Sequence, residues 1–344
     1  MNTAQQFWNW FSENQERFSG IHGKSMDEVN ALFDEVMPVL HAYNEGLSLE
    51  IGARQPPYEI IITAQGIKQY FAAAEQLVAQ APAIPNWQIT ALKPAVGDHF
   101  DFRMGEITVN CENLRFIPLQ DEDDEDAVAI RIIHRDYPAN DGALKNALTT
   151  GIYNVMDCLL GEKNATLDIS SLEIAAAQEE GEEVLPFKEL PHYINWKKKE
   201  RKIADVRHPE DSMTLYQGTA DGVKIFLTAN TGLNYYNFKT AYPMLFRVVA
   251  DFSQLYDEEG DNQSILEPVY EIEDRIIEAL KVADKGFYLL SETKGEQRTT
   301  CFYTNDEAFV LSLLEKEQAN NDRIQLTGEI VFDPYWVEVG DFIR

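Results

Sequence analysis

Hydrophobic positions toward the end of the chain follow first a helical period and then an alternating one. Between residues 266 and 280 the apolar side chains recur every three or four positions, at Val269, Ile272, Ile276 and Leu280. Two strand-like runs follow at 286–294 and 300–304, joined by a tip at Lys294-Gly295. Asn305 then opens a second helix, and 324–332 alternates again. This order of helix, strand, strand, helix, strand predicts helices on one face of an antiparallel sheet.

The beginning of the chain shows the same order of elements. After a capping-box pattern at Ser25 and Glu28, residues 29–40 have helical spacing. The ranges 47–51 and 58–63 read as paired strands, 67–78 as a second helix and 87–92 as a third strand. Matching positions are separated by 240 residues: Val29 and Val269, Leu32 and Ile272, Val36 and Ile276, Leu40 and Leu280, Gly46 and Gly286, Leu49 and Leu289. We therefore expect a shared topology, which gene duplication and convergence explain equally well. Pro38 is expected to bend or end its helix early.

Both halves contain further elements around these repeated stretches. Strands are predicted at 114–120 and 127–135, a helix at 144–159 and a strand around 167–175, which suggests one larger sheet in the first half. The second half opens with a hairpin, 214–219 and 223–228, around Asp221-Gly222. A strand at 245–252 that crosses over into the helix after Leu266 would complete a ferredoxin-like arrangement.

A basic segment divides the chain. Five of its 29 basic residues fall within the seven positions 196–202, and the flanking parts carry net charges of −19 and −14. The sequence thus predicts two α+β domains with antiparallel sheets covered by helices. They are an N-terminal domain at 1–195, a basic linker at 196–204 and a ferredoxin-like domain at 205–344. A phosphate-binding or peptide-binding patch is the alternative interpretation of the basic segment.

The net charge of −29 separates this chain from most globular proteins of 344 residues. Such a charge disfavours nucleic acid as a partner and favours a basic protein partner. The three cysteines are widely spaced and form no CxxC pair, which is typical of reduced thiols in the cytoplasm. The first residues lack the features of a signal peptide, and no stretch of about 18 apolar residues could span a membrane. We therefore expect a cytoplasmic protein.

Several short motifs resemble parts of catalytic, phosphate-binding or metal sites, but none has the full pattern of such a site. Gly23-Lys24-Ser25 ends like a phosphate-binding loop but lacks its first glycine and a preceding strand. His99, Asp101 and Arg103 alternate, which an exposed polar strand face explains. The acidic runs 121–126 and 257–261 could gather hard cations only adventitiously. No catalytic, cofactor-binding or metal-ligating residue is predicted, and no cofactor is expected.

Several stretches of the second half form a recognisable pattern. They are Tyr216-Gln217-Gly218-Thr219 before Asp221-Gly222, the strand at 245–249, the helix to Leu280, Cys301-Phe302-Tyr303-Thr304 and Asp333-Pro334-Tyr335-Trp336. With this pattern the second half resembles the bacterial domain of unknown function 695. That family is similar to regulator of ribonuclease activity B, a small acidic ferredoxin-like protein that inhibits an endoribonuclease by binding it. The first half, with Phe7-Trp8-Asn9-Trp10-Phe11, resembles the uncharacterised region that accompanies this domain.

Two functional classes follow from these observations. The first is a non-catalytic binding or regulatory protein whose acidic surface docks on a basic protein, and the resemblance supplies its precedent. The second is an enzyme or small-ligand-binding protein with a pocket between the two domains. The sequence leaves the oligomeric state open.

Overall fold

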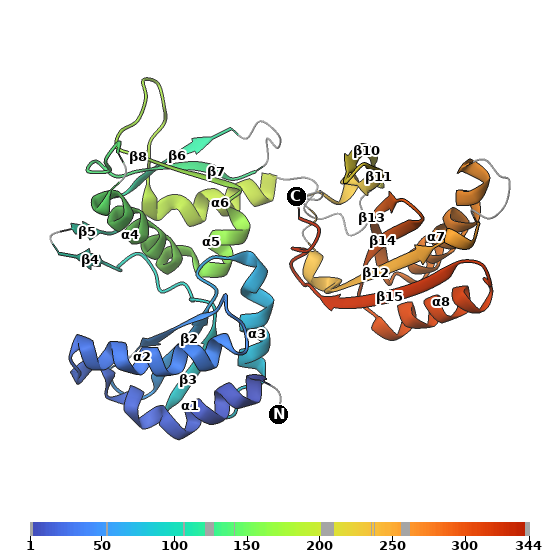
Figure 1. The fold of residues 1–344 in the computed structure, drawn as a ribbon. Helices are drawn as coiled ribbons and strands as arrows, with labels where there is room; N and C mark the ends of the chain where they lie inside the picture. The colour runs from blue at the N-terminus through green and yellow to red at the C-terminus, as the bar shows by residue number, and fades with distance from the viewer. Residues whose placement is uncertain are drawn as a thin grey trace. The chain divides into compact units, whose positions relative to one another are not determined.

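The computed structural model shows an α+β protein (Figure 1). It describes residues 3–52, 54–105, 107–120, 127–140, 142–200, 210–234, 236, 238–255 and 262–340. The chain divides into two compact units, Met1–Arg201 and Lys202–Arg344.

The first lobe of unit 1, residues 3–93, contains a three-stranded sheet covered by three helices. Its elements are α1 (Thr3–Ser19), α2 (Met26–His41), β1 (Ser48–Gly52), β2 (Tyr58–Thr63), α3 (Phe71–Ala79) and β3 (Trp87–Ala91). Four aromatic residues of α1, Phe7, Trp8, Phe11 and Phe18, are buried. The Trp8 indole N–H donates to the Leu77 carbonyl of α3 at 2.7 Å. Strand β2 pairs antiparallel with β1 and parallel with β3, so α3 is the crossover of a βαβ unit.

The second lobe of unit 1, residues 94–200, has its own sheet and its own core. Its elements are β4 (Phe102–Met104), β5 (Ile107–Val109), β6 (Arg115–Leu119), β7 (Ala129–Ile133), α4 (Ala143–Leu160), α5 (Glu162–Asp168), β8 (Ser171–Ala175), β9 (Leu185–Pro186) and α6 (Leu190–Glu200). The sheet order is β8-β7-β6-β9, with β7 and β8 parallel. Its core includes Phe116, Ile130, Ile152 and Phe187. Strands β4 and β5 form a separate hairpin.

One expectation for the first half is therefore wrong. The described part of unit 1 has three separate sheets and not one larger sheet, because β3 and β6 do not pair and the β4–β5 hairpin pairs with neither neighbouring sheet. Most strand pairs are antiparallel, as expected, but crossover helices make β2 parallel to β3 and β7 parallel to β8.

Unit 2 is built on one six-stranded antiparallel sheet. Its elements are β10 (Met213–Ala220), β11 (Val223–Asn230), β12 (Met244–Asp251), α7 (Asn262–Ala283), β13 (Gly286–Lys294), β14 (Gln297–Thr304), α8 (Glu307–Ala319) and β15 (Gln325–Phe332). The strand order is β10-β11-β13-β14-β12-β15. The predicted turn joins β10 to β11, with Asp221 and Gly222 both at positive φ.

The two faces of this sheet are covered by different kinds of structure. Helices α7 and α8 pack on one face around Phe246, Ile272 and Phe302. The loop after β11 and the segment after β15 cover the other face, where the Trp336 ring stacks on Tyr303 at 4.1 Å. Tyr335 and Trp336 are both buried.

The repeated element order is confirmed, but the strand pairing differs. The order α2, β1, β2, α3, β3 matches α7, β13, β14, α8, β15, and neither Gly46 nor Gly286 has room for a Cβ atom. Strand β3 pairs directly with β2, whereas β12 lies between β14 and β15. In unit 2 the element before α7 is β12, the strand that lies between β14 and β15. In the first lobe the element before α2 is helix α1, so no equivalent strand is present between β2 and β3. The prediction of one shared topology is therefore wrong.

Two local expectations need correction. Pro38 does not shorten α2, which continues to His41, because the proline lies only one turn before the natural end of the helix. The predicted linker begins too early, since residues 196–200 continue α6, with Lys197, Lys198 and Lys199 in its last turn. Residues 201–204 lie outside the described part of the chain. The residues Gly23-Lys24-Ser25 lead into α2, where Ser25 and Glu28 form a capping box.

Candidate functional site

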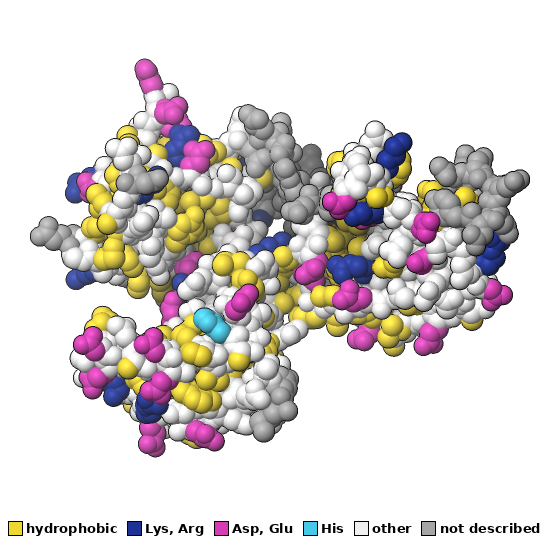
Figure 2. All heavy atoms as spheres, in the orientation of Figure 1, with side chains coloured by type: hydrophobic (Ala, Val, Ile, Leu, Met, Phe, Trp, Pro, Cys, Tyr) yellow, Lys and Arg dark blue, Asp and Glu magenta, His cyan; other side chains and the backbone are white. Residues whose placement is uncertain are grey.

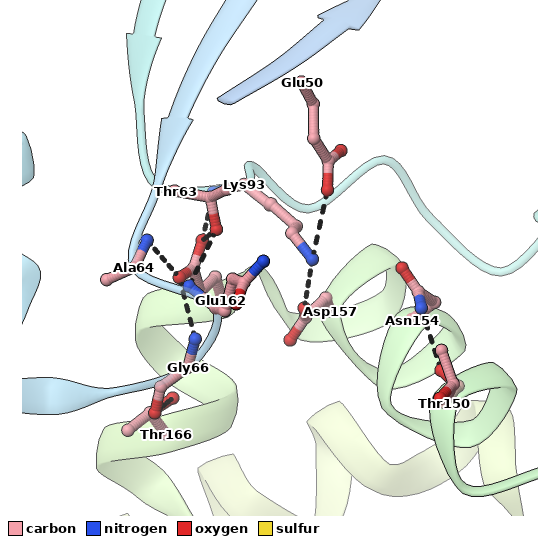
Figure 3. A network of polar contacts seen from close by, with 11 residues as sticks. Glu50, Thr63, Ala64, Gly66, Lys93, Thr150, Asn154, Asp157, Glu162 and Thr166 are labelled. Atoms are coloured by element: carbon pink, nitrogen blue, oxygen red, sulfur yellow. Dashed lines mark hydrogen bonds and ion pairs between the residues drawn. The ribbon is translucent and has the colours of Figure 1, made fainter. Parts of the chain in front are cut away.

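A buried carboxylate joins the two lobes of unit 1 (Figure 3). Glu162 is the first residue of α5 and is fully buried. Its carboxylate accepts hydrogen bonds from the Thr63 hydroxyl at 2.7 Å and from the backbone N–H groups of Ala64, Gly66 and Lys93 at 2.9 Å each. These donors lie at the end of β2 or just after β2 and β3 of the first lobe. The four bonds replace the water that Glu162 loses on burial.

Next to this carboxylate, Lys93 lies between two acids. Its Nζ is 3.1 Å from the Asp157 carboxylate of α4 and 3.3 Å from the Glu50 carboxylate of β1. Burial opposes the protonated amine, but the two carboxylates outweigh it and raise the pKa of Lys93 above its usual value. Burial also raises the pKa of Asp157, and Lys93 offsets only part of that effect. Glu50, Lys93 and Asp157 are called the charged triad below.

A cleft of about 740 Å³ opens beside the charged triad. The triad lines it together with the Tyr153 ring, which is 45% exposed. Its other polar lining residues include Gln65, Thr150, Asn154, Thr166 and Ser171. The volume is in the range of small-molecule sites in proteins, whereas the lining is richer in hydroxyl and amide groups than most.

The topology of the first lobe explains where this cleft lies. Gln65 and Gly66 follow the carboxyl end of β2, and Lys93 follows that of β3. Because β2 and β3 are parallel neighbours, these residues meet at one edge of the sheet. The crevice outside the carboxyl ends of parallel strands is the usual place for ligands in such sheets. The α4 side chains Tyr153, Asn154 and Asp157 form the facing wall.

The described residues around the cleft offer no activated nucleophile. A nucleophilic lysine needs a lowered pKa, whereas the charged triad raises the pKa of Lys93. Burial raises the pKa of the Cys158 thiol to about 11, so very little thiolate is present at neutral pH. The geometry therefore suits binding better than covalent catalysis.

Unit 2 contains a second buried polar network, between α7 and the sheet. The Arg298 guanidinium donates to the Glu273 carboxylate at 2.8 and 2.9 Å, to the Thr293 hydroxyl at 2.8 Å and to the Ser291 hydroxyl at 2.5 Å. The Thr300 hydroxyl also donates to Glu273 at 2.6 Å. The cavity beside this network is about 10 Å³, room for one water at most. We interpret it as a structural anchor for α7.

The residues weighed as sites from the sequence do not come together. His99 is exposed and its Nδ1 is 3.2 Å from Asp98, whereas Asp101 accepts from Arg103 at 2.7 Å. The acidic runs 121–126 and 257–261 lie outside the described residues. Within the ranges that the structure describes, no group of three His, Cys, Asp or Glu side chains could hold a metal ion.

Sequence reasoning missed the cleft entirely, although part of its signal was present. Polar residues directly after two predicted strands, at Gln65 and Lys93, are the pattern of a site at strand ends. This pattern indicates a site only if the two strands are parallel, and the sequence did not show that β2 and β3 are parallel. The partners on α4 and α5 are 64 or more positions away from Lys93, as for Asp157, and no periodicity links them.

Comparisons with protein-family models, with curated proteins and with solved structures found no match to this chain. Among the helices of the described residues, none combines the length and the apolar character that crossing a membrane requires.

Proposed function

We propose that unit 1 is a binding module for a small polar molecule and that the cleft is its site. The observation that carries the proposal is the position of a 740 Å³ cleft at the carboxyl ends of two parallel strands, with the charged triad on its wall. Small-ligand binding is the alternative that the sequence left open beside docking on a basic protein. The site lies within unit 1, whereas the sequence interpretation expected it between two domains.

The lining of the cleft favours one class of ligand. The charged triad has a net charge of −1, because Lys93 is balanced by two carboxylates. Anions such as phosphates are therefore disfavoured, and neutral or cationic molecules are favoured. The hydroxyl and amide groups suit a ligand with several hydroxyls, and the exposed face of Tyr153 suits stacking against a sugar ring. We propose a sugar or amino sugar as the ligand.

Titration of the full chain with neutral sugars, amino sugars and sugar phosphates, followed by calorimetry, tests this proposal. We expect binding of the first or second group and none of the third. Tyr153→Ala should weaken binding about tenfold, the effect of losing one stacking contact. The matched control is Tyr216→Ala, since Tyr216 in unit 2 is also 45% exposed. Binding of sugar phosphates alone, or equal losses in both variants, contradicts the proposal.

A second candidate function is regulation of a basic protein by docking, and the charge of −29 favours it. The strand order β13-β14-β12-β15 with α7 and α8 as crossovers supports the ferredoxin-like assignment of residues 205–344, which the resemblance to domain 695 and the ribonuclease regulator also implies. The three free cysteines support a cytoplasmic location.

Docking of this kind predicts a salt dependence. Affinity for a basic partner captured from the native cell extract should fall steeply between low and physiological salt, because ions screen the attraction. Neutralising residues 121–126 or 257–261 should mainly slow association. Surface plasmon resonance at several salt concentrations measures both effects, and salt-independent binding would contradict this function.

A further inference from the structure

The first strand of unit 2 is a long, unprotected sheet edge. Strand β10 pairs along all eight of its residues with β11, and no other described strand pairs with it. Among the described residues, no strand therefore pairs with the backbone N–H and C=O groups on its outer side. Proteins usually protect such edges with charged residues, proline or a bulge, because an open edge recruits another strand.

Strand β10 carries none of these protections. Its sequence from Met213 to Ala220 contains no charged residue and no proline, in a chain with a net charge of −29. The opposite edge of the same sheet is different. Strand β15 contains Glu329, whose carboxylate accepts from Arg247 at 2.7 Å. The β15 edge of the sheet therefore carries a charged residue, whereas the β10 edge carries none.

The side chains around β10 are apolar and exposed. Leu215 is 69% exposed, Met213 52% and Phe226 of β11 43%. The register places Phe226 opposite Gln217, so Phe226, Leu215 and Met213 share one face of the sheet. Helices α7 and α8 pack on β13, β14 and β15, and this cover does not extend to β10.

We infer that β10 pairs antiparallel with β10 of a second copy of this chain, across a two-fold axis. The two six-stranded sheets would then form one continuous sheet. The edge is complementary to itself, since antiparallel pairing about Gln217 matches residues 214–220 with the same seven residues of the second copy and keeps paired side chains on one face. Because β10 is uncharged, the contact brings no like charges together at the seam, which matters for two copies that each carry −29.

The sign of the salt dependence follows from this arrangement. The strands attract through backbone hydrogen bonds and apolar contacts, whereas the rest of the two acidic surfaces repels. Added salt screens the repulsion and should strengthen the dimer. Docking on a basic partner has the opposite dependence, so the two contacts are distinguishable in one titration.

Sedimentation of the full chain tests the inference. We expect a mass twice the 39.2 kDa of the chain at about 100 µM, and a dissociation constant that falls as salt rises. Gln217 lies beside the centre of β10, so Gln217→Lys and Gln217→Glu should each weaken the dimer about tenfold by placing like charges across the axis. An equimolar mixture of the two variants should restore it.

The matched control is Gln325→Lys, the same substitution on the exposed opposite edge strand β15, which should leave the dimer unchanged. A wild-type monomer, an unaffected Gln217→Lys variant, or a mixture that stays monomeric overturns the inference. The wild type could instead be a monomer whose small-angle scattering changes in the Gln217→Lys variant. This result would show that another part of the same chain covers β10, and it would also overturn the inference of a dimer.

Discussion

The side chain of Glu162 shows how one residue can hold a fold together without a positive partner. Its carboxylate is fully buried, and its hydrogen bonds come from three backbone N–H groups and one hydroxyl. Each bond to a charged acceptor contributes about 1.5–3 kcal/mol, so the set offsets a large cost of burying charge. The sequence gives little warning of this, because an isolated glutamate after Gly161 looks like a helix start on the surface.

The cysteines permit a pH prediction at the same scale. Burial raises the pKa of Cys111 and Cys158 to about 11, and it also raises the pKa of Cys301. Because only the thiolate reacts, labelling of the native chain by an aromatic disulfide reagent should be slow at pH 8 and should accelerate about tenfold per pH unit toward pH 11. Labelling in urea is the control. Native labelling as fast as in urea would show that these thiols are accessible and ionised.

At the scale of elements, helix α7 depends on the Arg298–Glu273 pair as well as on its apolar face. Both side chains are almost fully buried, with 8% and 12% exposed. Arg298→Met should therefore destabilise unit 2 by about 3 kcal/mol, because it leaves the Glu273 carboxylate buried without its partner. Adding Glu273→Met should recover most of this loss.

Urea denaturation of the single and double variants measures both changes in the free energy of unfolding. The control is Arg247→Met on the neighbouring strand β12, whose carboxylate partner Glu329 is 61% exposed and which should cost much less. A double variant as unstable as the single one would show that Glu273 is not the source of the penalty.

The same scale shows what periodicity can predict. Strands β2, β12 and β14 and helix α4 overlap their predicted ranges, because their apolar residues either recur at the matching period or form a short apolar run that both faces bury. The choice of strand neighbours was not predictable in this way. The difference between β3, which pairs with β2, and β15, which pairs with β12, depends on a strand more than 70 positions away from β15, as the pair Met244 and Phe332 shows. The cleft depends on such pairings, so the sequence did not predict it.

At the scale of the whole molecule, acidic residues are spread between apolar ones on the visible surface of each unit, without a continuous acidic face (Figure 2). The α+β class was predictable, because it depends on the sum of many local periods. The net charge was also known from the sequence, and it predicts two salt effects of opposite sign, on docking and on self-association. The effect on self-association could not be assigned to a surface before β10 was known to be an edge.

The bonds of Glu162 have a consequence for how unit 1 opens. The backbone N–H groups of Ala64, Gly66 and Lys93 donate to the same carboxylate. These hydrogen bonds break only when Glu162 moves away or when the backbone after β2 or β3 moves away from it. The two lobes of unit 1 thus form one cooperative unit of unfolding at this point, although each has its own core. In amide hydrogen exchange these three positions should report a single opening free energy, and a ligand in the neighbouring cleft should raise it at all three together.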